Sequence, residues 1–186
     1  MRTFEPLDGG AVSRAIAEAG DVLCQVGVEI HSEEALSVLG DHGVRIERAG
    51  RRAYFSAPVI ERALQRAPAR VTLYDALGEQ THDIGGDGTY FAPGSAAMHV
   101  LDAQAGVMRP PTTADYVRYV KVVGGLRHLG AQSTAFIPAD VHRRISDSYR
   151  LYLSLLFGRK PVVTGTFAAE GLAVMMDLQV AVRGTR

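Results

Sequence analysis

Small polar residues follow a short apolar run at positions 160–167, KPVVTGTF. A strand that enters this Thr-Gly-Thr turn presents backbone amides and the hydroxyl groups of Thr164 and Thr166 at its carboxyl end. Ligands of open α/β sheets and of barrels bind at that end of the strands. Threonine and glycine are also common strand-end residues, so a binding role and a structural role both stay open.

A second turn that could contact a ligand lies at positions 90–96, YFAPGSA. Aromatic residues here precede a turn of small residues that includes Gly94 and Ser95. Ring faces and accessible backbone can hold an apolar or cationic group of a ligand. Ordinary packing of a β-hairpin explains the same residues equally well.

Other catalytic patterns are missing from the sequence, which has no GxSxG, HExxH, HxH, GxGxxG or GxxxxGK[ST] motif. The glycine-rich run 85–88 follows a predicted strand instead of opening a helix, so we interpret it as a plain turn. Asp140 and His142 offer at most two ligands, and we predict structural roles for the six histidines and no metal site. No catalytic side chain is identified, and we expect that the catalytic nucleophile is either absent from this chain or not a side chain.

Composition narrows the class of protein. The 186 residues contain 20 acidic and 20 basic side chains, which gives no basic field for a nucleic-acid partner. No apolar run approaches the roughly 18 residues of a membrane span, and the N-terminus does not resemble a signal peptide. The single cysteine, Cys24, excludes an internal disulfide and is predicted to lie in the core. We expect a soluble, cytoplasmic protein that binds neither nucleic acid nor membrane.

Hydrophobic periodicity predicts an α/β fold in three parts. Residues 1–70 form a helical cap, with helices at 13–25, 32–39 and 56–67 and one extended piece at 44–46. Residues 71–110 form two β-hairpins, the first at 71–86 and the second from the segments 89–91, 98–101 and 107–108.

In residues 111–186, helices at 114–123, 146–157 and 168–182 alternate with strands at 129–136 and 161–164, which predicts a parallel sheet with crossover helices. Two such strands do not close a barrel of eight, so we expect the first βα units of an incomplete TIM barrel.

Several segments, taken in order, resemble the trimethylamine methyltransferase family. They are GVEIHSEEAL (27–36), LGDHGVRIE (39–47), VTLYDALG (71–78), YFAPGSAAMHVLD (90–102) with its continuation GVMRPPTTADY (106–116), and KPVVTGTF (160–167). The similarity runs over nearly the whole chain, and the order and spacing of the segments carry it.

The resemblance implies corrinoid-dependent methyl transfer from trimethylamine or from a quaternary amine such as glycine betaine, with the glycine-betaine-type, nonpyrrolysine branch expected. Cobalamin belongs to a separate corrinoid protein and supplies the nucleophile, so no cofactor is expected to bind this chain directly. The protein has to orient the amine, exclude water and surround an N-methyl cation. The positions expected to line the substrate pocket are Gly94, Ser95, Thr134, Phe136, Thr164 and Thr166.

Family members are far longer than this chain, so the resemblance implies an N-terminal part whose activity is incomplete. An alternative is a non-catalytic, truncated homologue that acts as a binding or assembly module. Uncovered helix faces and a free sheet edge would then favour a homo-oligomer. A third interpretation is an independent small α/β binding protein that shares the fold alone.

Overall fold

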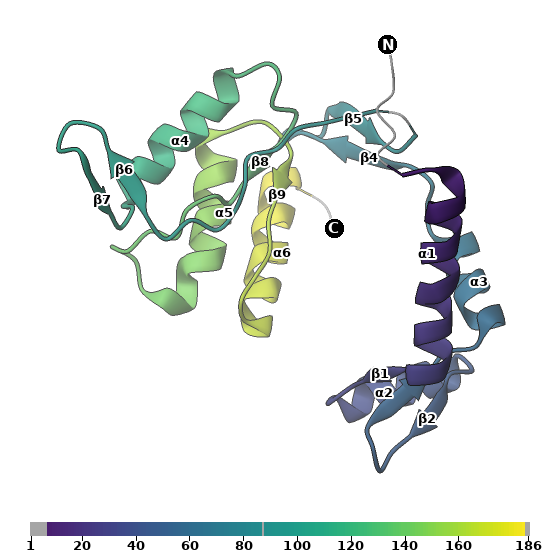
Figure 1. Ribbon diagram of the computed structural model, residues 1–186. Coiled ribbons are helices and arrows are strands. Elements are labelled where there is room, and N and C mark those ends of the chain that lie inside the picture. Colours follow the sequence, from purple (N-terminus) through teal and green to yellow (C-terminus); the bar gives the residue numbers. More distant parts are fainter. Residues whose placement is uncertain (1–6, 87, 185–186) are drawn as a thin grey trace. The chain divides into compact units, whose positions relative to one another are not determined.

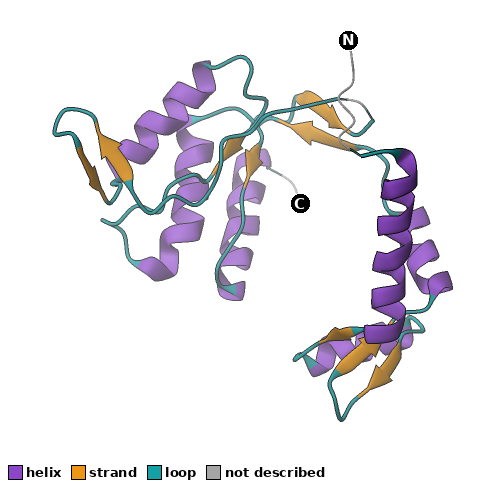
Figure 2. Cartoon of the chain, in the orientation of Figure 1, coloured by secondary structure: helices purple, strands orange, loops and turns teal. Residues whose placement is uncertain are grey.

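The computed structural model describes residues 7–86 and 88–184. The chain divides into two compact units, Met1–Pro68 and Ala69–Arg186. Both units mix helices with short strands, as Figures 1 and 2 show. The prediction of a mixed α/β chain is therefore confirmed.

Three helices form the larger part of the first unit: α1 (Gly9–Asp21), α2 (Glu33–Asp41) and α3 (Ala57–Arg66), with a π-helical turn, η1 (Val22–Val26), continuing α1. The first helix begins earlier than predicted because Asp8 caps it, accepting a hydrogen bond from Ala11 N at 2.8 Å. Ser13 lies inside the helix and donates to Gly9 O. The predicted cap at Ser32 is confirmed by a bond from Ala35 N.

A three-stranded antiparallel sheet packs against these helices, in the order β1 (Val28–Glu29), β3 (Arg52–Tyr54), β2 (Arg45–Glu47). Only the extended piece that became β2 was predicted. The strands β1 and β3 contain two and three residues, too few for an alternating pattern to emerge from the sequence. The core of the unit is the buried cluster of Leu36, Val44 and Ala53.

Two β-hairpins were predicted in the second unit, and both are present. The first pairs β4 (Val71–Tyr74) with β5 (Gln80–Ile84), and the second pairs β6 (Val100–Asp102) with β7 (Val107–Arg109). Asp75 shapes the first turn, because its Oδ1 accepts bonds from Leu77 N and Glu79 N at 2.9 Å each.

The helices α4 (Thr113–Gly125), α5 (Ser146–Phe157) and α6 (Ala169–Arg183) agree closely with prediction, and a 3₁₀ turn, η2 (Arg143–Ile145), precedes α5. A capping box between Thr112 and Asp115 opens α4. The strands β8 (Gln132–Ser133) and β9 (Val162–Val163) pair in parallel, as predicted, but they are shorter than expected.

None of the helices in the described part of the chain has the length and apolar character needed to cross a membrane.

A third extended segment, residues 91–97, runs parallel to β8 on its other side. Bridges join Phe91 to Leu129 and Ala97 to Phe136, and Ile137 N donates to Ala97 O at 3.0 Å. The sequence had assigned residues 89–91 to a hairpin, because the aromatic pair next to a Pro-Gly turn has the same local pattern in either setting. Segment 91–97 is therefore a parallel neighbour of β8 and not a hairpin strand.

The parallel segments follow one another in the sheet in chain order: 91–97, β8, β9. The helix α4 packs on α5, and α5 packs on α6 (Figure 1). Successive right-handed crossovers in chain order place their helices on one face of a sheet, where consecutive helices meet. The clustered residues Tyr116, Val120 and Leu153 form the core between α4 and α5.

Lys160 and Arg159 precede β9 and bind other elements near its amino end. Lys160 Nζ donates to the carbonyl oxygens of Val123, Leu126 and Leu129 at 2.8, 2.6 and 2.6 Å. This ammonium group thereby binds carbonyls at the C-terminal end of α4, where the helix dipole favours a cation. Arg159 forms ion pairs with Asp75 and Glu79, which attach the first hairpin to the segment between α5 and β9.

Gly27 permits the turn from η1 into β1. Its φ is 69°, and a Cβ atom at this position would lie 2.5 Å from Ala53 O. We expect Gly27→Ala to lower the free energy of unfolding of the first unit by about 2 kcal/mol, because it adds left-handed strain and a backbone clash. Urea unfolding followed by circular dichroism measures the change.

The matched control is Gly20→Ala. Gly20 lies in α1, and a Cβ atom there would meet nothing within 4 Å. This variant should raise the free energy of unfolding by roughly 0.5–1 kcal/mol through helix propensity. Equal effects of the two substitutions would show that the backbone at Gly27 is not constrained.

Candidate functional site

Thr134 and Thr164 follow β8 and β9 directly, at the carboxyl ends of the two strands. Their hydroxyl oxygens lie 3.2 Å apart, and Thr134 N donates to Val163 O at 3.3 Å. Thr134 is buried, whereas Thr164 is half-buried. The two threonines predicted from separate strands therefore form one polar contact across the sheet.

A cavity of about 440 Å³ lies between segment 91–97, α4 and the residues after β8. Among the described residues, no charged side chain lines it. Its lining residues are Pro93, Gly94, Ser95, Ala96, Ala97, Tyr119, Ala135 and Phe136. It is an open depression of the surface and not an enclosed cavity.

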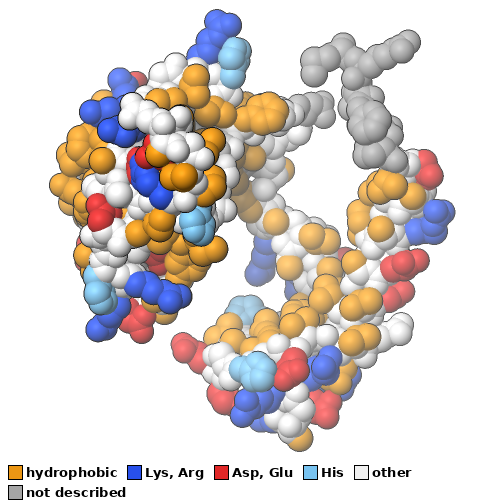
Figure 3. All heavy atoms as spheres, turned by 60° about the vertical axis from the view of Figure 1, so that its left-hand side comes forward, with side chains coloured by type: hydrophobic (Ala, Val, Ile, Leu, Met, Phe, Trp, Pro, Cys, Tyr) orange, Lys and Arg blue, Asp and Glu red, His pale blue; other side chains and the backbone are white. Residues whose placement is uncertain are grey.

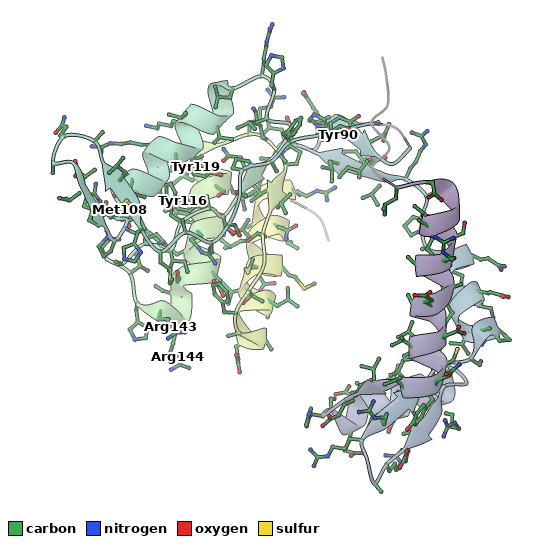
Figure 4. All side chains as sticks on the ribbon, in the orientation of Figure 1. Tyr90, Met108, Tyr116, Tyr119, Arg143 and Arg144 are labelled. Atoms are coloured by element: carbon green, nitrogen blue, oxygen red, sulfur yellow. The ribbon has the colours of Figure 1, made fainter. Side chains whose placement is uncertain are left out.

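Aromatic rings form one wall of this cavity. The ring centroids of Tyr119 and Phe136 lie 5.1 Å apart, and Tyr116 meets the two rings edge-on at 5.9 and 6.4 Å. Tyr116 and Tyr119 both come from α4 (Figure 4), and a spacing of three residues puts them on the same side of the helix. Because Tyr116 is fully buried, the wall is anchored in the core.

A chain of hydrogen bonds fixes the turn at Gly94. The Tyr119 hydroxyl donates to Ser133 O at 3.1 Å, and Ser133 Oγ donates to Gly94 O at 2.9 Å. Burial raises the pKa of Tyr119, and it raises the pKa of Tyr116 to about 12. Both phenols therefore stay neutral and serve as hydrogen-bonding and packing groups.

A buried ion pair joins the loops that follow the two strands. Arg150 Nη2 donates to Asp147 Oδ1 at 2.5 Å, and Arg150 Nη1 donates to Thr134 O at 2.8 Å. The other carboxylate oxygen of Asp147 accepts bonds from Phe167 N at 2.6 Å and Thr166 Oγ1 at 3.0 Å. The pair therefore holds the backbone after β8 and the backbone after β9 at a fixed separation.

Charge pairing compensates the burial of these groups. Arg150 is 2% exposed, and its guanidinium carbon lies 5.6 Å from the ring centroid of Phe167. Burial raises the pKa of Asp147, but the hydrogen bonds from Phe167 N, Arg150 and Thr166 together outweigh burial and hold this pKa below its usual value. Asp147 is therefore a charged anchor at neutral pH.

The six residues predicted for the pocket do not share one cavity. Gly94, Ser95 and Phe136 line the aromatic-walled cavity. Thr164 lines a different cavity of about 180 Å³ together with residues of α5, α6 and the first hairpin. The hydroxyl of Thr166 is engaged by Asp147.

Sequence reasoning missed Tyr119, Asp147 and Arg150. Each belongs to a helix that was predicted correctly, so the element was known while the role of the side chain was not. The only signal was the spacing of three residues that places Tyr119 beside Tyr116 and Arg150 beside Asp147. Such spacing is common on helices that have no functional role.

A third cavity, of about 400 Å³, has a different character, because it is lined by polar and charged side chains of the first hairpin. Its lining residues are Arg70, Gln80, Thr81, His82, Asp83, Gly85, Gly88 and Tyr90, the last of which is labelled in Figure 4. Within residues 7–86 and 88–184, no three His, Cys, Asp or Glu side chains are grouped to hold a metal ion.

We expect Asp147→Asn to lower the free energy of unfolding of the second unit by about 3 kcal/mol, because it leaves the buried Arg150 without its counter-ion. The pH dependence has a defined sign. A carboxyl group whose pKa is lower in the folded state stabilises the protein at neutral pH, and this stabilisation is lost as the pH falls through the folded pKa. The variant should lack this acid-sensitive component.

Unfolding midpoints measured between pH 7 and pH 3 compare the two proteins. Glu170→Gln, an exposed substitution in the first turn of α6, is the control and should change stability by no more than about 0.5 kcal/mol. An Asp147→Asn protein as stable as the control would contradict the anchoring role.

The chain is similar to methyltransferases over its whole length. The profile of the family described as trimethylamine methyltransferase (MTTB) matches residues 1–186. A glycine betaine methyltransferase of Desulfitobacterium hafniense (strain Y51) is 30% identical over 135 residues, which are 72% of this chain and 28% of that protein. The trimethylamine methyltransferase MttB of Desulfitobacterium hafniense (strain DSM 10664 / DCB-2) is 20% identical over 164 residues, which are 88% of this chain and 33% of that protein.

The chain thus spans about a third or less of the length of the curated relatives it matches. The family profile nevertheless covers the cap, both hairpins and all of the βα units described above. The resemblance noted in the sequence is confirmed: this chain belongs to the trimethylamine methyltransferase family.

Proposed function

We propose that this chain takes part in the transfer of a methyl group from a methylated amine to a corrinoid protein. Family membership supports the reaction class, and the cavity walled by Tyr119 and Phe136 is the observation that carries the proposal to particular residues. A neutral, aromatic-walled space at the ends of parallel strands has the chemistry that an N-methylated ammonium group requires.

The arrangement of the second unit supports a barrel as the framework. Segment 91–97, β8 and β9 lie in chain order, and their crossover helices pack in succession, which is the arrangement found in βα barrels. We propose that these are the first units of a TIM barrel, preceded by the cap of residues 1–70 and the hairpin region. The substrate site then lies at the carboxyl ends of the strands.

The proposed roles of the residues are binding and orientation. Rings such as those of Tyr119 and Phe136 attract a cation by roughly 0.5–2 kcal/mol, according to how well water is excluded. The small residues Gly94 and Ser95 leave room for methyl groups, and the hydroxyl pair of Thr134 and Thr164 offers a polar contact nearby in the sheet.

The corrinoid cofactor, when bound to its own protein, supplies the nucleophile that accepts the methyl group. The residues of this chain are consistent with a nucleophile that comes from the cofactor, because the cavity lining contains no side chain that would act as a nucleophile at neutral pH. We propose that cobalamin stays with the partner protein.

The substrate class is a tertiary or quaternary methylated amine, with trimethylamine and glycine betaine as the two named candidates. The relative that is 30% identical is named for glycine betaine, which favours a quaternary amine. Cation–π attraction acts on the methylated nitrogen of either compound. A cytoplasmic location agrees with a reduced corrinoid partner.

A second candidate function is a binding or assembly module without catalysis. Exposed apolar side chains on and before α6 favour it, because Phe167, Leu172 and Met176 are 75%, 52% and 58% exposed. Such a surface would be covered by further protein, either another part of a barrel or a second copy of the chain.

Incubating the chain with glycine betaine or trimethylamine and a reduced, cobalamin-loaded corrinoid protein separates these functions. We expect the chain to bind the amine, while a full-length family member is needed for the change in the cobalt spectrum that accompanies methylation. A spectral change produced by this chain alone would show that it is catalytically complete. Failure to bind any methylated amine would contradict the proposed function.

Gly94→Leu tests the cavity directly. A Cβ atom at Gly94 would meet nothing within 4 Å, so we expect leucine to be tolerated there and to occupy the space of the cavity. We expect the dissociation constant for glycine betaine, measured by calorimetry, to rise at least about tenfold, which corresponds to 1.4 kcal/mol.

Gly124→Leu is the matched control, because a Cβ atom there also meets nothing within 4 Å and the residue lies in the last turn of α4, outside the cavity lining. It should bind glycine betaine with unchanged affinity. If Gly94→Leu binds as tightly as the control, the amine does not occupy this cavity.

A further inference from the structure

The third cavity opens on the surface beside the first hairpin and has a polar lining. Among the described residues, no aliphatic side chain lines it, whereas hydrophobic side chains are spread over the face of the second unit that Figure 3 shows. Two side chains of opposite charge, Arg70 and Asp83, line it together with the ring of Tyr90. None of these three residues lines the aromatic-walled cavity. We call the third cavity the hairpin pocket.

The register of the first hairpin places Arg70 and Asp83 on one face. Thr72 pairs directly with Asp83 across the two strands, and Thr72 Oγ1 donates to Asp83 Oδ1 at 2.7 Å. Arg70 directly precedes β4, two residues before Thr72, so the alternation of side chains turns it to the same side. The two charged residues are therefore diagonal neighbours across the hairpin, close enough to contact one ligand.

A close approach of the chain to itself fixes the backbone beside Arg70. Gly85 has a φ of 138°, and a Cβ atom there would lie 2.4 Å from Ala69 O and 3.2 Å from Cγ of Arg70. Glycine is the residue that permits both this conformation and this approach. The stem of Arg70 therefore packs on Gly85, and its guanidinium group extends from a fixed position.

The two charges do not neutralise each other. Within residues 7–86 and 88–184, Arg70 makes no side-chain ion pair or hydrogen bond, and Asp83 makes no ion pair. The carboxylate of Asp83 accepts from neutral groups, namely the hydroxyl of Thr72 and, at 3.3 and 3.4 Å, the amide of Gln80. An arginine and an aspartate that line one pocket without touching leave room between them for a ligand that meets both.

Tyr90 adds an aromatic ring to the same pocket. It is 45% exposed, and Figure 4 shows it beside the first hairpin. Its ring centroid lies 4.8 Å from that of His82, which it meets edge-on. The imidazole of His82 packs in turn on the backbone of Gly130, where a Cβ atom would lie 2.8 Å from His82 Nε2. The ring of Tyr90 is therefore supported from one side and open to a cation from solvent.

We propose that the hairpin pocket binds a small zwitterion, with its carboxylate on Arg70 and its ammonium group on Asp83 and Tyr90. The planar guanidinium group matches a carboxylate, and a carboxylate beside a ring attracts an ammonium group. A ligand with a single charge fits less well, because an anion would meet Asp83 and a cation would meet Arg70. Free amino acids and betaines share this chemistry.

The inference goes beyond the proposed function and does not depend on it, because the hairpin pocket and the aromatic-walled cavity have no lining residue in common. A zwitterion bound at the first hairpin would be a second ligand of the chain.

Titrations of the whole chain, followed by the amide signals in ¹H–¹⁵N NMR spectra, test the pocket with glycine, glycine betaine, acetate and methylammonium. We expect a zwitterion to shift the amides of residues 80–86 in a saturable way. Acetate and methylammonium should bind at least about tenfold more weakly, because each lacks one of the two charge-assisted contacts.

Saturable shifts with glycine alone would assign the pocket to amino acids, and saturable shifts with glycine betaine alone would assign it to betaines. Acetate that binds as tightly as the zwitterions, or shifts that never saturate, would overturn the inference.

Single substitutions separate the two charges. Arg70→Gln should weaken binding of the zwitterion at least about tenfold. Asp83→Asn should weaken it too, but it should strengthen the binding of acetate, because the carboxylate that repels an anion is gone. Thr72→Val removes the bond to Asp83 and leaves both charges in place, so it should keep most of the affinity. Equal losses in Thr72→Val and Asp83→Asn would show that Asp83 only supports the hairpin, against the proposal.

Arg144→Gln is the matched control for Arg70→Gln, because it removes the charge of another exposed arginine, in η2 and outside the pocket lining. It should leave zwitterion binding unchanged. If it weakens binding as much as Arg70→Gln does, binding follows net charge and the site is not at the hairpin.

The same spectra report on the aromatic-walled cavity through the amides of residues 94–97 and 135–136. Glycine has no N-methyl group and should leave these signals in place, whereas glycine betaine should shift them in the unmodified chain but not in Gly94→Leu. Absence of the hairpin shifts alone would refute the hairpin pocket, and absence of the cavity shifts alone would refute the proposed function.

Discussion

The buried ion pair between Asp147 and Arg150 is the interaction on which the carboxyl end of the sheet depends. The strands β8 and β9 contribute only two residues each, so their backbone pairing alone holds the two strands together weakly. The pair adds contacts to the backbone after both strands, at Thr134 O and Phe167 N. Removing either partner would leave the other as an uncompensated charge in the interior, which is far more costly than losing a surface contact.

The two ends of the same strands use different chemistry. At the amino end, Lys160 donates to carbonyls around the end of α4, and burial lowers the pKa of this ammonium group. At the carboxyl end, an anion and a cation neutralise each other while hydroxyls and amides surround them. The two ends therefore differ in character, because the carboxyl end carries oriented donors and acceptors, whereas the amino end is closed by contacts to backbone carbonyls.

The sequence predicted the elements of this chain better than its site. Long amphipathic helices such as α5 were placed accurately, because many residues contribute to their pattern. The short strands β1 and β3 and the parallel pairing of segment 91–97 were missed, since both are decided by contacts with residues distant in sequence. Gly94 and Phe136, which were predicted to line a substrate pocket, do line the aromatic-walled cavity, while their role in binding stays a prediction. Tyr119 was not, because its importance comes from reaching across to Ser133.

Segment 91–97 is bridged only at its two ends, where Phe91 pairs with Leu129 and Ala97 with Phe136 on either side of β8. The Gly94 turn that lines the cavity lies between these bridges and is held by Ser133 Oγ through its backbone carbonyl, so its side chains can change without breaking the bridges on either side. Specificity and stability are thereby encoded at separate positions of one strand. Small changes at residues 93–96 can therefore alter the lining of this pocket while the paired parts of the scaffold stay the same.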